Sequence, residues 1–374
     1  MKNLSQRLLS IDAFRAITML TMIFVNDVSG VTNIPSWIEH TKAADDGMGF
    51  ADTVFPAFLF IVGLSIPFAI GKRIAKQESF IKTEGHILTR SLALIVMGFF
   101  HVNLEGYNSE AAILPYAIWE ILITIGFFLI WMDYKQKQYL LQGLGIVLLL
   151  AMAALYKGEG GQWMRPSWWG ILGIIGWAYL VSATVFLLVK GKFPALLVLL
   201  ALFLAINFAK HTGVMAIDIP VIGDASSIAL IMAGVVISSI PKKSIPVLLG
   251  IGAAAIVFGL LIRPYTEGIS KIRSTPSWVL ICAGISTVVF AGMMWLVDKK
   301  GKMDWFSFIK PAGTSTLTCY LIPYLLYSLM LLVHFHYPEF LSSGIGGILR
   351  SIAVAFIVIW IAGRMEKVNI RLKI

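Results

Sequence analysis

The chain has 374 residues, of which 58% are hydrophobic and only 13% are charged, whereas about a quarter of a soluble domain is charged. This composition excludes a soluble globular fold and predicts an all-α, polytopic membrane protein. The net charge of +10 does not indicate nucleic-acid binding, because the basic residues are distributed among the loops between apolar segments. Cys282 and Cys319 both lie inside apolar segments, which excludes a disulfide scaffold or a paired-cysteine metal site.

Twelve apolar windows of about 20 residues, bounded by charged residues, Pro and Gly, predict the membrane spans. They are 8–28, 51–71, 89–104, 112–132, 138–155, 168–189, 193–209, 225–240, 245–262, 276–297, 312–335 and 344–364. The windows 89–104 and 225–240 are short, so ten spans are an alternative. No small-residue cleavage site follows the first window, which therefore predicts an uncleaved span. No low-complexity linker divides the chain, which predicts a single domain over residues 1–374.

The distribution of Lys and Arg predicts that both termini lie in the cytoplasm. Of the 30 basic residues, 21 fall in the predicted cytoplasmic segments and span ends, seven fall in the predicted outer loops, and Arg15 and Arg350 lie within spans. Cytoplasmic loops of membrane proteins carry such an excess of positive charge. The loop 31–50 is therefore expected on the outer face.

Ionisable side chains gather where this outer loop enters the second span. The stretch begins at Trp37 and holds His40, Asp45 and Asp46, and Asp52 follows at the mouth of the apolar run. Ionisable groups at the edge of the hydrocarbon are costly, and histidine exchanges a proton near neutral pH. The stretch predicts a reaction centre, although a connecting loop with solvated charges remains an alternative.

The first span also carries polar residues. Asp12 and Arg15 lie three residues apart on one helical face, which predicts either a structural ion pair or a pair that lines a water-filled cavity. Ser10 is a candidate helix cap. Asn26, at the outer end, is suited to donate a hydrogen bond to a developing oxyanion or to satisfy backbone groups at a helix end.

Further polar groups lie at membrane depth or at helix starts. His101 ends the third span, and Glu120, in the middle of the fourth, needs a partner such as Arg15. Trp278 lies in a segment whose composition favours an ordinary helix start, and Lys310 precedes a glycine and hydroxyls suited to phosphate. The sequence has no phosphate loop, nucleophile elbow or H-E-x-x-H motif, so a hydrolase or an ATPase has no support.

Four segments resemble the heparan-α-glucosaminide N-acetyltransferase family and its bacterial relatives. They are LLSIDAFRAITMLTMIFVND, FADTVFPAFLFIVGLSIPFAI, KIRSTPSWVL and KPAGTSTLTCYLIPY. The resemblance covers most of the chain in order and is most specific in the first 70 residues. It implies a bacterial inner-membrane enzyme, without a metal, that moves acetyl from cytosolic acetyl-CoA to the amine of a glucosamine-type sugar on the outer side.

The resemblance also implies roles for individual residues. His40 matches the family's active-site histidine, and Asn26 and Asp52 match residues that flank it, so these three are the expected catalytic residues. The imidazole serves either as a base for the amine or as a carrier of the acetyl group, and Asp52 or Asp45 orients it. The loop after His40 is longer than in the animal members, and the spans 168–189 and 193–209 are additional.

The remaining site residues are expected to bind the two substrates. Those expected at the acceptor are Asp45, Asp46, Trp37, Trp278 and His101. Those expected at acetyl-CoA, whose nucleotide part is anionic, are Arg7, Arg15, Lys72, Arg73, Arg90 and Lys310. A homodimer is left open. The alternative functions are a transporter or channel for a small polar solute and a structural membrane protein.

Overall fold

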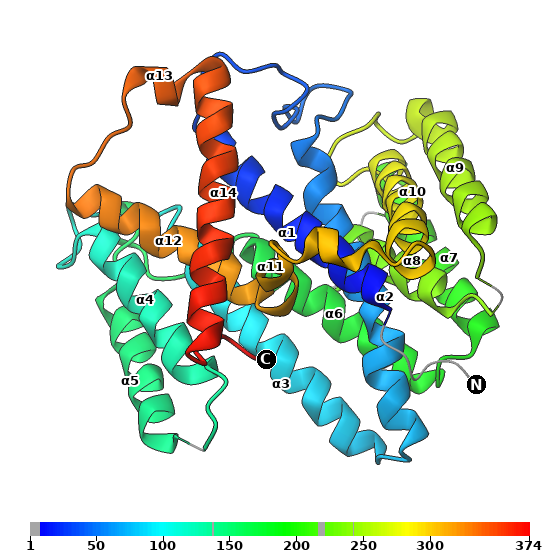
Figure 1. Ribbon diagram of the computed structural model, residues 1–374, viewed down its shortest axis with the longest axis horizontal. Helices are drawn as coiled ribbons and strands as arrows, with labels where there is room; N and C mark the ends of the chain where they lie inside the picture. The colour runs from blue at the N-terminus through cyan, green and yellow to red at the C-terminus, as the bar shows by residue number, and fades with distance from the viewer. Residues whose placement is uncertain (1–7, 137, 216–220, 242) are drawn as a thin grey trace.

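The computed structural model describes residues 8–136, 138–215, 221–241 and 243–374, and helices make up nearly all of the regular structure in these ranges (Figure 1). The described residues form no strand, only three isolated β-bridges. The α-helices are α1 Leu9–Val28, α2 Ala51–Ala75, α3 Phe80–Val102, α4 Tyr116–Trp131, α5 Tyr139–Leu155, α6 Gly170–Leu188, α7 Phe193–His211, α8 Ser226–Ser239, α9 Ile245–Ile262, α10 Pro276–Met293, α11 Lys310–Thr314, α12 Thr316–Leu332, α13 Glu339–Ser342 and α14 Gly344–Lys367.

Each predicted span contains a helix, because a chain in hydrocarbon must satisfy its backbone hydrogen bonds within the segment. Among the described residues, eight helices are long and apolar enough to cross a membrane, and α4, α5, α8 and α12 are apolar but shorter. The all-helical membrane architecture is thus confirmed. The number of about twelve spans and the cytoplasmic placement of the termini stay predictions.

The helices differ most from the predicted spans at the start of α3 and inside the window 312–335. The helix α3 starts at Phe80, nine residues before the predicted span, because Ser79 caps it by accepting a hydrogen bond from the Lys82 backbone N–H at 3.4 Å. The window 312–335 is interrupted at Ser315, where α11 ends and α12 begins. The first helix begins at Leu9, so Ser10 lies inside it rather than at its cap, and its hydroxyl donates to Asp298 Oδ2 at 2.6 Å.

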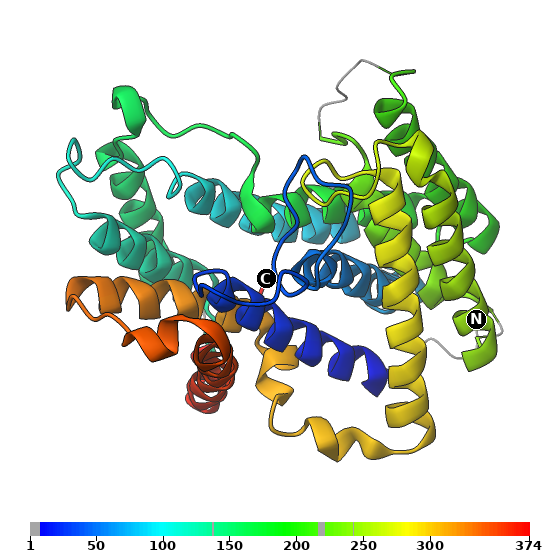
Figure 2. The same cartoon turned by 90° about the horizontal axis from the view of Figure 1, so that it is seen from above.

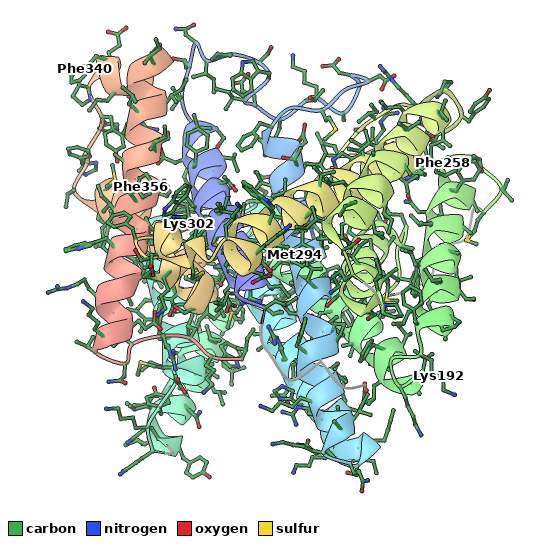
Figure 3. All side chains as sticks on the ribbon, turned by 45° about the vertical axis from the view of Figure 1, so that its right-hand side comes forward. Lys192, Phe258, Met294, Lys302, Phe340 and Phe356 are labelled. Atoms are coloured by element: carbon green, nitrogen blue, oxygen red, sulfur yellow. The ribbon has the colours of Figure 1, made fainter. Side chains whose placement is uncertain are left out.

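Large apolar side chains project from the outside of the bundle (Figure 3). Phe258 on α9 is 56% exposed, and only 17% of the most apolar window of α7 and of α9 is buried. An apolar surface this extensive is suited to lipid and not to water. The chain is therefore a multi-pass membrane protein.

The helix α2 is packed closely against its neighbours, and this fixes the position of both of its ends. It contacts α1, α6, α8 and α10. At Gly63, a Cβ atom would lie 1.9 Å from the carbonyl oxygen of Ile231, and at Gly234 it would lie 2.0 Å from that of Phe60. Only glycine allows α2 and α8 to approach this closely. Viewed from above, the His40 loop (residues 29–50) lies over α1 and α2 and beside the start of α10 (Figure 2).

Candidate active site

A histidine–aspartate pair lies at the start of α2. Asp52 is in the first turn of the helix and has no exposed surface, and its Oδ1 lies 2.7 Å from Nδ1 of His40. A carboxylate only accepts hydrogen bonds, so the proton between them belongs to Nδ1. Nε2 of His40 therefore keeps its lone pair, and the His40 side chain is 39% exposed. This arrangement suits a general base or a nucleophile.

Three further hydrogen bonds hold Asp52 in place. Its Oδ2 accepts from the backbone N–H groups of Thr41 at 3.0 Å and Gly49 at 2.9 Å. The indole N–H of Trp278 donates to the Asp52 backbone carbonyl at 3.1 Å. The tight turn needs glycine at position 49, where a Cβ atom would lie 1.9 Å from the carbonyl oxygen of Glu39. These bonds and the helix N-terminus stabilise a buried carboxylate that would otherwise be costly.

Lys271 is the residue at this site that sequence reasoning missed. Its Nζ lies 3.3 Å from Nδ1 and 3.4 Å from Nε2 of His40. Burial lowers the pKa of the Lys271 ammonium, and the nearby Asp52 carboxylate opposes that shift. The sequence offered one signal, because Lys271 opens the KIRSTPSWVL segment of the resemblance. As one of the seven basic residues of the predicted outer loops, Lys271 contributed only to the predicted orientation.

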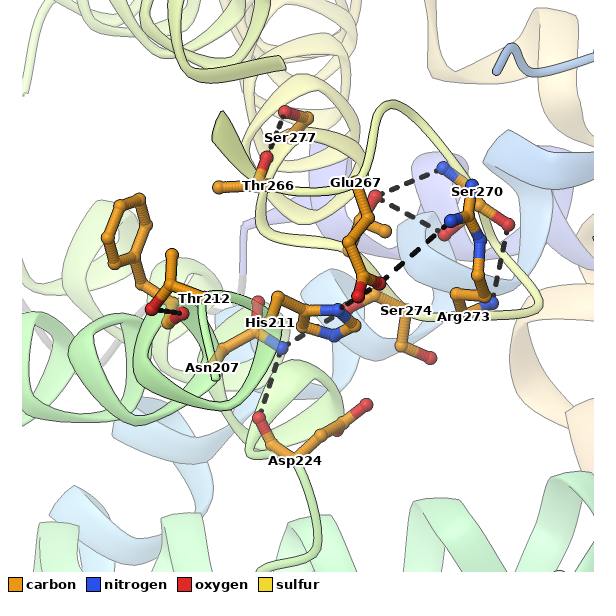
Figure 4. A network of polar contacts seen from close by, with 12 residues as sticks. Asn207, His211, Thr212, Asp224, Thr266, Glu267, Ser270, Arg273, Ser274 and Ser277 are labelled. Carbon is orange, nitrogen blue, oxygen red and sulfur yellow. Dashed lines mark hydrogen bonds and ion pairs between the residues drawn. The ribbon is translucent and has the colours of Figure 1, made fainter. Parts of the chain in front are cut away.

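The Lys271 loop (residues 263–275) is held by a network of polar contacts (Figure 4). The Glu267 carboxylate lies 3.1 Å from Nδ1 of His211 and 3.9 Å from the guanidinium of Arg273. The Asn207 side chain donates to the backbone carbonyl of Ser274 at 3.1 Å. Glu267 and Ser274 both adopt positive φ angles, 60° and 55°, which are uncommon for residues other than glycine. A fixed loop conformation therefore sets the position of Lys271.

Asp46 joins the His40 loop to the Lys271 loop. Its Oδ1 accepts from the backbone N–H of Ile269 at 2.6 Å, and its Oδ2 accepts from Nε of Arg263 at 2.8 Å. The Ile269 hydrogen bond lowers the pKa of Asp46 below its usual value; burial opposes this shift, and the Arg263 guanidinium adds to it. At Gly268 (φ +79°), a Cβ atom would lie 2.5 Å from the carboxyl carbon. The contacts of Asp46 thus give it a structural role.

The other residues expected at the acceptor lie in three different places. Asp45 is exposed on the His40 loop, and Trp37 on the same loop is 66% exposed. Trp278 is buried, 2% exposed, and supports Asp52 from behind. His101 is buried near the end of α3 and stacks on Tyr324 of α12, with ring centroids 4.2 Å apart. Among the described residues, the rings that His101 contacts are those of Phe127, Tyr320 and Tyr324, and none of them belongs to the His40 site.

Two polar residues of α1 and α4 have partners that the sequence did not predict. Asn26 is exposed, whereas the adjacent Asp27 is buried and pairs with Arg350 of α14 at 2.9 Å. Glu120 accepts a hydrogen bond from Ser328 of α12. The suggested partner Arg15 instead donates to Asp12, to Ser65 and to the Gly313 carbonyl.

A cavity of about 320 Å³ lies further along α2. Its wall includes Arg15 of α1 and Arg90 of α3, and from α2 it takes residues between Phe58 and Ala69. The Arg90 guanidinium lies over the ring of Tyr179, 5.0 Å from its centroid. At about 1.5 Å per residue, the α2 wall begins about 9 Å from Asp52 and ends about 25 Å from it. The cavity is thus suited to an elongated ligand with an anionic part.

Three further residues expected at acetyl-CoA, Lys72, Arg73 and Lys310, lie outside this cavity wall. Lys72 is exposed at the far end of α2, Arg73 pairs with Glu78 at 2.7 Å, and Lys310 is exposed at the start of α11. Arg7 lies outside the described residues. The glycine and threonine of the predicted phosphate cradle, Gly313 and Thr314, do line the cavity. Within the part of the chain that the structure describes, no group of three His, Cys, Asp or Glu side chains is arranged to hold a metal ion.

Fold and site together define a multi-pass helical membrane protein with a histidine–aspartate pair where a loop enters a span. The chain belongs to the family described as "Domain of unknown function (DUF5009)", which matches residues 7–222, more than half of the chain. It is similar to the heparan-alpha-glucosaminide N-acetyltransferases of Homo sapiens, 36% identical over 100 residues, and of Mus musculus, 33% identical over 99 residues.

These two matches cover 27% and 26% of this chain and 14% of each relative. The resemblance expected from the sequence is confirmed, and the chain is a distant relative of these enzymes. Because the matched stretch is a small part of each relative, the activity does not follow from the similarity alone.

Proposed function

We propose that the protein is a membrane acetyltransferase that moves acetyl from acetyl-CoA to the amine of a glucosamine-type sugar. The observation that carries this proposal is the arrangement along α2. The His40–Asp52 pair lies at the start of the helix, and the cavity that holds Arg15 and Arg90 begins about 9 Å further along it. One rigid helix would thus hold both substrates.

The cavity is assigned to the donor. Acetyl-CoA carries several phosphate charges, which arginine guanidinium groups bind strongly through paired hydrogen bonds. Arg15 and Arg90 reach the cavity from α1 and α3. We assign the phosphates to this pair and the thioester arm to the part of the cavity towards Phe58. Lys72, Arg73 and Lys310 are left with a weaker role, that of attracting the anion from solution.

The chemistry needs one base and one acyl group. In a direct transfer, Nε2 of His40 takes the proton of the amine, whose nitrogen forms a bond to the thioester carbon. The carbon–sulfur bond then breaks, and CoA leaves as the thiolate. In the two-step alternative, Nε2 attacks the thioester carbon itself, CoA leaves, and the amine takes the acetyl group from His40. Both routes need the lone pair that Asp52 leaves on Nε2.

The acceptor is assigned to the open side of the His40 loop. Asp45 and Trp37 are exposed there, and a carboxylate and an indole together suit a cationic amino sugar. We place this loop on the outer face of a bacterial inner membrane, with both termini in the cytoplasm, from the excess of Lys and Arg in the opposite loops.

The test is CoA release by the purified full chain in lipid nanodiscs, with acetyl-CoA as donor and glucosamine as acceptor. We expect one thiol released for each N-acetylglucosamine formed, and no release above background by His40→Ala. Absence of release from a folded wild-type chain would refute the proposal. Flux of glucosamine through proteoliposomes without acetyl-CoA would support the transporter alternative instead.

A further inference from the structure

Lys271 occupies an unusual position relative to the imidazole of His40. Its Nζ is almost equally distant from the two ring nitrogens, 3.3 and 3.4 Å. An atom in the ring plane at these distances would overlap the carbon between the two nitrogens. The ammonium therefore lies over the face of the ring and is not aligned with either nitrogen's in-plane direction. Its N–H groups therefore make no well-aligned hydrogen bond to His40 and can donate to another acceptor.

The region beside this ammonium is where an acyl oxygen would be. A carbon that reacts with or near Nε2 approaches along the lone pair, in the plane of the ring. Its carbonyl oxygen then projects to one side of that plane. Because Nζ lies 3.4 Å from Nε2 on one face of the ring, an oxygen on that face comes within hydrogen-bond distance of it.

We propose that Lys271 is a catalytic residue, and that its ammonium donates a hydrogen bond to the acyl oxygen as negative charge develops on it. This inference rests on the proposed acyl transfer. In the transition state, the carbonyl π electrons move onto the oxygen while the new bond to carbon forms. Lys271 keeps its proton throughout. When the tetrahedral intermediate collapses, the electrons return to the carbonyl and the leaving group departs with its own bonding pair.

The surroundings of Lys271 fit a fixed donor. Its loop is held by the Glu267–Arg273 ion pair and by the hydrogen bond from the Ile269 backbone N–H to Asp46. The donor is therefore positioned before the reaction begins. The Asp52 carboxylate is close enough to stabilise the partly buried ammonium.

The inference is tested with diethyl pyrocarbonate, a small reagent that acylates neutral imidazole through a tetrahedral oxyanion and requires no CoA. The rate of ethoxycarbonyl transfer to His40 is measured by peptide mass spectrometry at pH 8. We expect Lys271→Met to slow this rate at least tenfold, Lys271→Gln, which retains an N–H donor, to slow it less, and Lys271→Arg to stay nearest to wild type. His334 and His336 are exposed and serve as internal references.

Lys42→Met is the matched control, because Lys42 is an exposed charge on the His40 loop, and the His40 rate should not change. A wild-type rate at His40 in both Lys271→Met and Lys271→Gln would overturn the inference. Transfer of the label to Lys271 instead of His40 would also overturn it, since the amine would then be a carrier.

The acetyl-CoA assay separates this inference from the proposed function. If the proposed function holds, Lys271→Met should lower kcat about 100- to 1,000-fold and leave the dissociation constant of acetyl-CoA unchanged. If wild type releases no CoA but the reagent rate still depends on Lys271, the proposed function fails and the donor role stands. If CoA release is normal in Lys271→Met, the donor role fails and the proposed function stands.

Discussion

Replacing Asp52 with Asn tests the central geometry of the site with the smallest change of shape. Both Thr41 and Gly49 donate backbone N–H groups to Oδ2 of Asp52, so the amide oxygen of Asn must occupy that position. The amide nitrogen then takes the place of Oδ1, 2.7 Å from Nδ1 of His40. Because an amide N–H₂ group only donates, Nδ1 must become the acceptor and the ring proton must move to Nε2. The lone pair needed for the reaction is then lost.

The magnitude follows from the same contacts. A misplaced tautomer removes the base from most molecules, and loss of a general base costs about 10²- to 10⁴-fold in rate. Folding should change little, because Asn keeps the acceptor for both backbone N–H groups. Asp52→Ala leaves those buried groups unpaired, which costs about 1–3 kcal/mol each. We therefore expect Asp52→Asn to lower the activity and leave the stability nearly unchanged, and Asp52→Ala to lower both.

The assay is CoA release at saturating glucosamine, with the thermal midpoint measured on the same samples. The double variant of His40→Ala and Asp52→Asn should be no slower than His40→Ala alone, because the two residues act as one unit. A wild-type kcat in Asp52→Asn would show that the tautomer of His40 is irrelevant and would refute this account of the site.

Three further predictions concern the topology, the acetyl-CoA site and the contacts of Asp46 that join the two loops. In a background without the native cysteines, Lys42→Cys should be labelled only from the outer side, and labelling only from the cytoplasm would reverse the orientation. Arg90→Ala should raise the KM for acetyl-CoA about 10- to 100-fold, whereas Lys72→Ala should change it less than threefold; equal effects would place the phosphates elsewhere. Asp46→Asn should lower the free energy of unfolding at pH 7 by about 1 kcal/mol or less, because the pair with Arg263 is partly exposed. Since the pKa of Asp46 is lowered by folding, its contribution is present above about pH 4, the unfolded value, and is lost as the pH falls further; a difference that stays constant down to pH 3 would contradict it.

The helices could be predicted because the bilayer imposes a length and an apolar composition on each span. The errors fall where another interaction decides the boundary. The polar first turns of α3 extend beyond the apolar window because Ser79 caps them. The break at Ser315 lies inside an apolar window and has no hydropathy signal.

The site was predictable only where its residues are close in sequence. His40 and Asp52 are 12 residues apart, and the geometry of one loop and one helix start brings them together. Lys271 is 231 residues from His40, and Arg263 is 217 residues from Asp46. Such pairs depend on how α9 packs on α10 and α10 on α2, which span prediction does not give. The same reason explains why Arg15 was wrongly suggested as the partner of Glu120: the partner depends on which neighbouring helix the Glu120 side chain faces, and its hydrogen bond comes from Ser328 of α12.

The attachments of the His40 loop and the Lys271 loop explain how reactive side chains can be held in fixed positions on segments without regular secondary structure. Long loops are usually mobile, and a reactive pair needs its atoms held within about 0.5 Å. The His40 loop is bound to α2 through Asp52 and to the Lys271 loop through Asp46, and the Lys271 loop is bound to α7 through Asn207. The attachments through Asp52 and Asn207 end on helices of the bundle, and the one through Asp46 joins the two loops to each other. The packed helices thereby hold the imidazole in place. In the proposed function, the acceptor binds on the exposed side of the His40 loop, which carries Asp45 and Trp37.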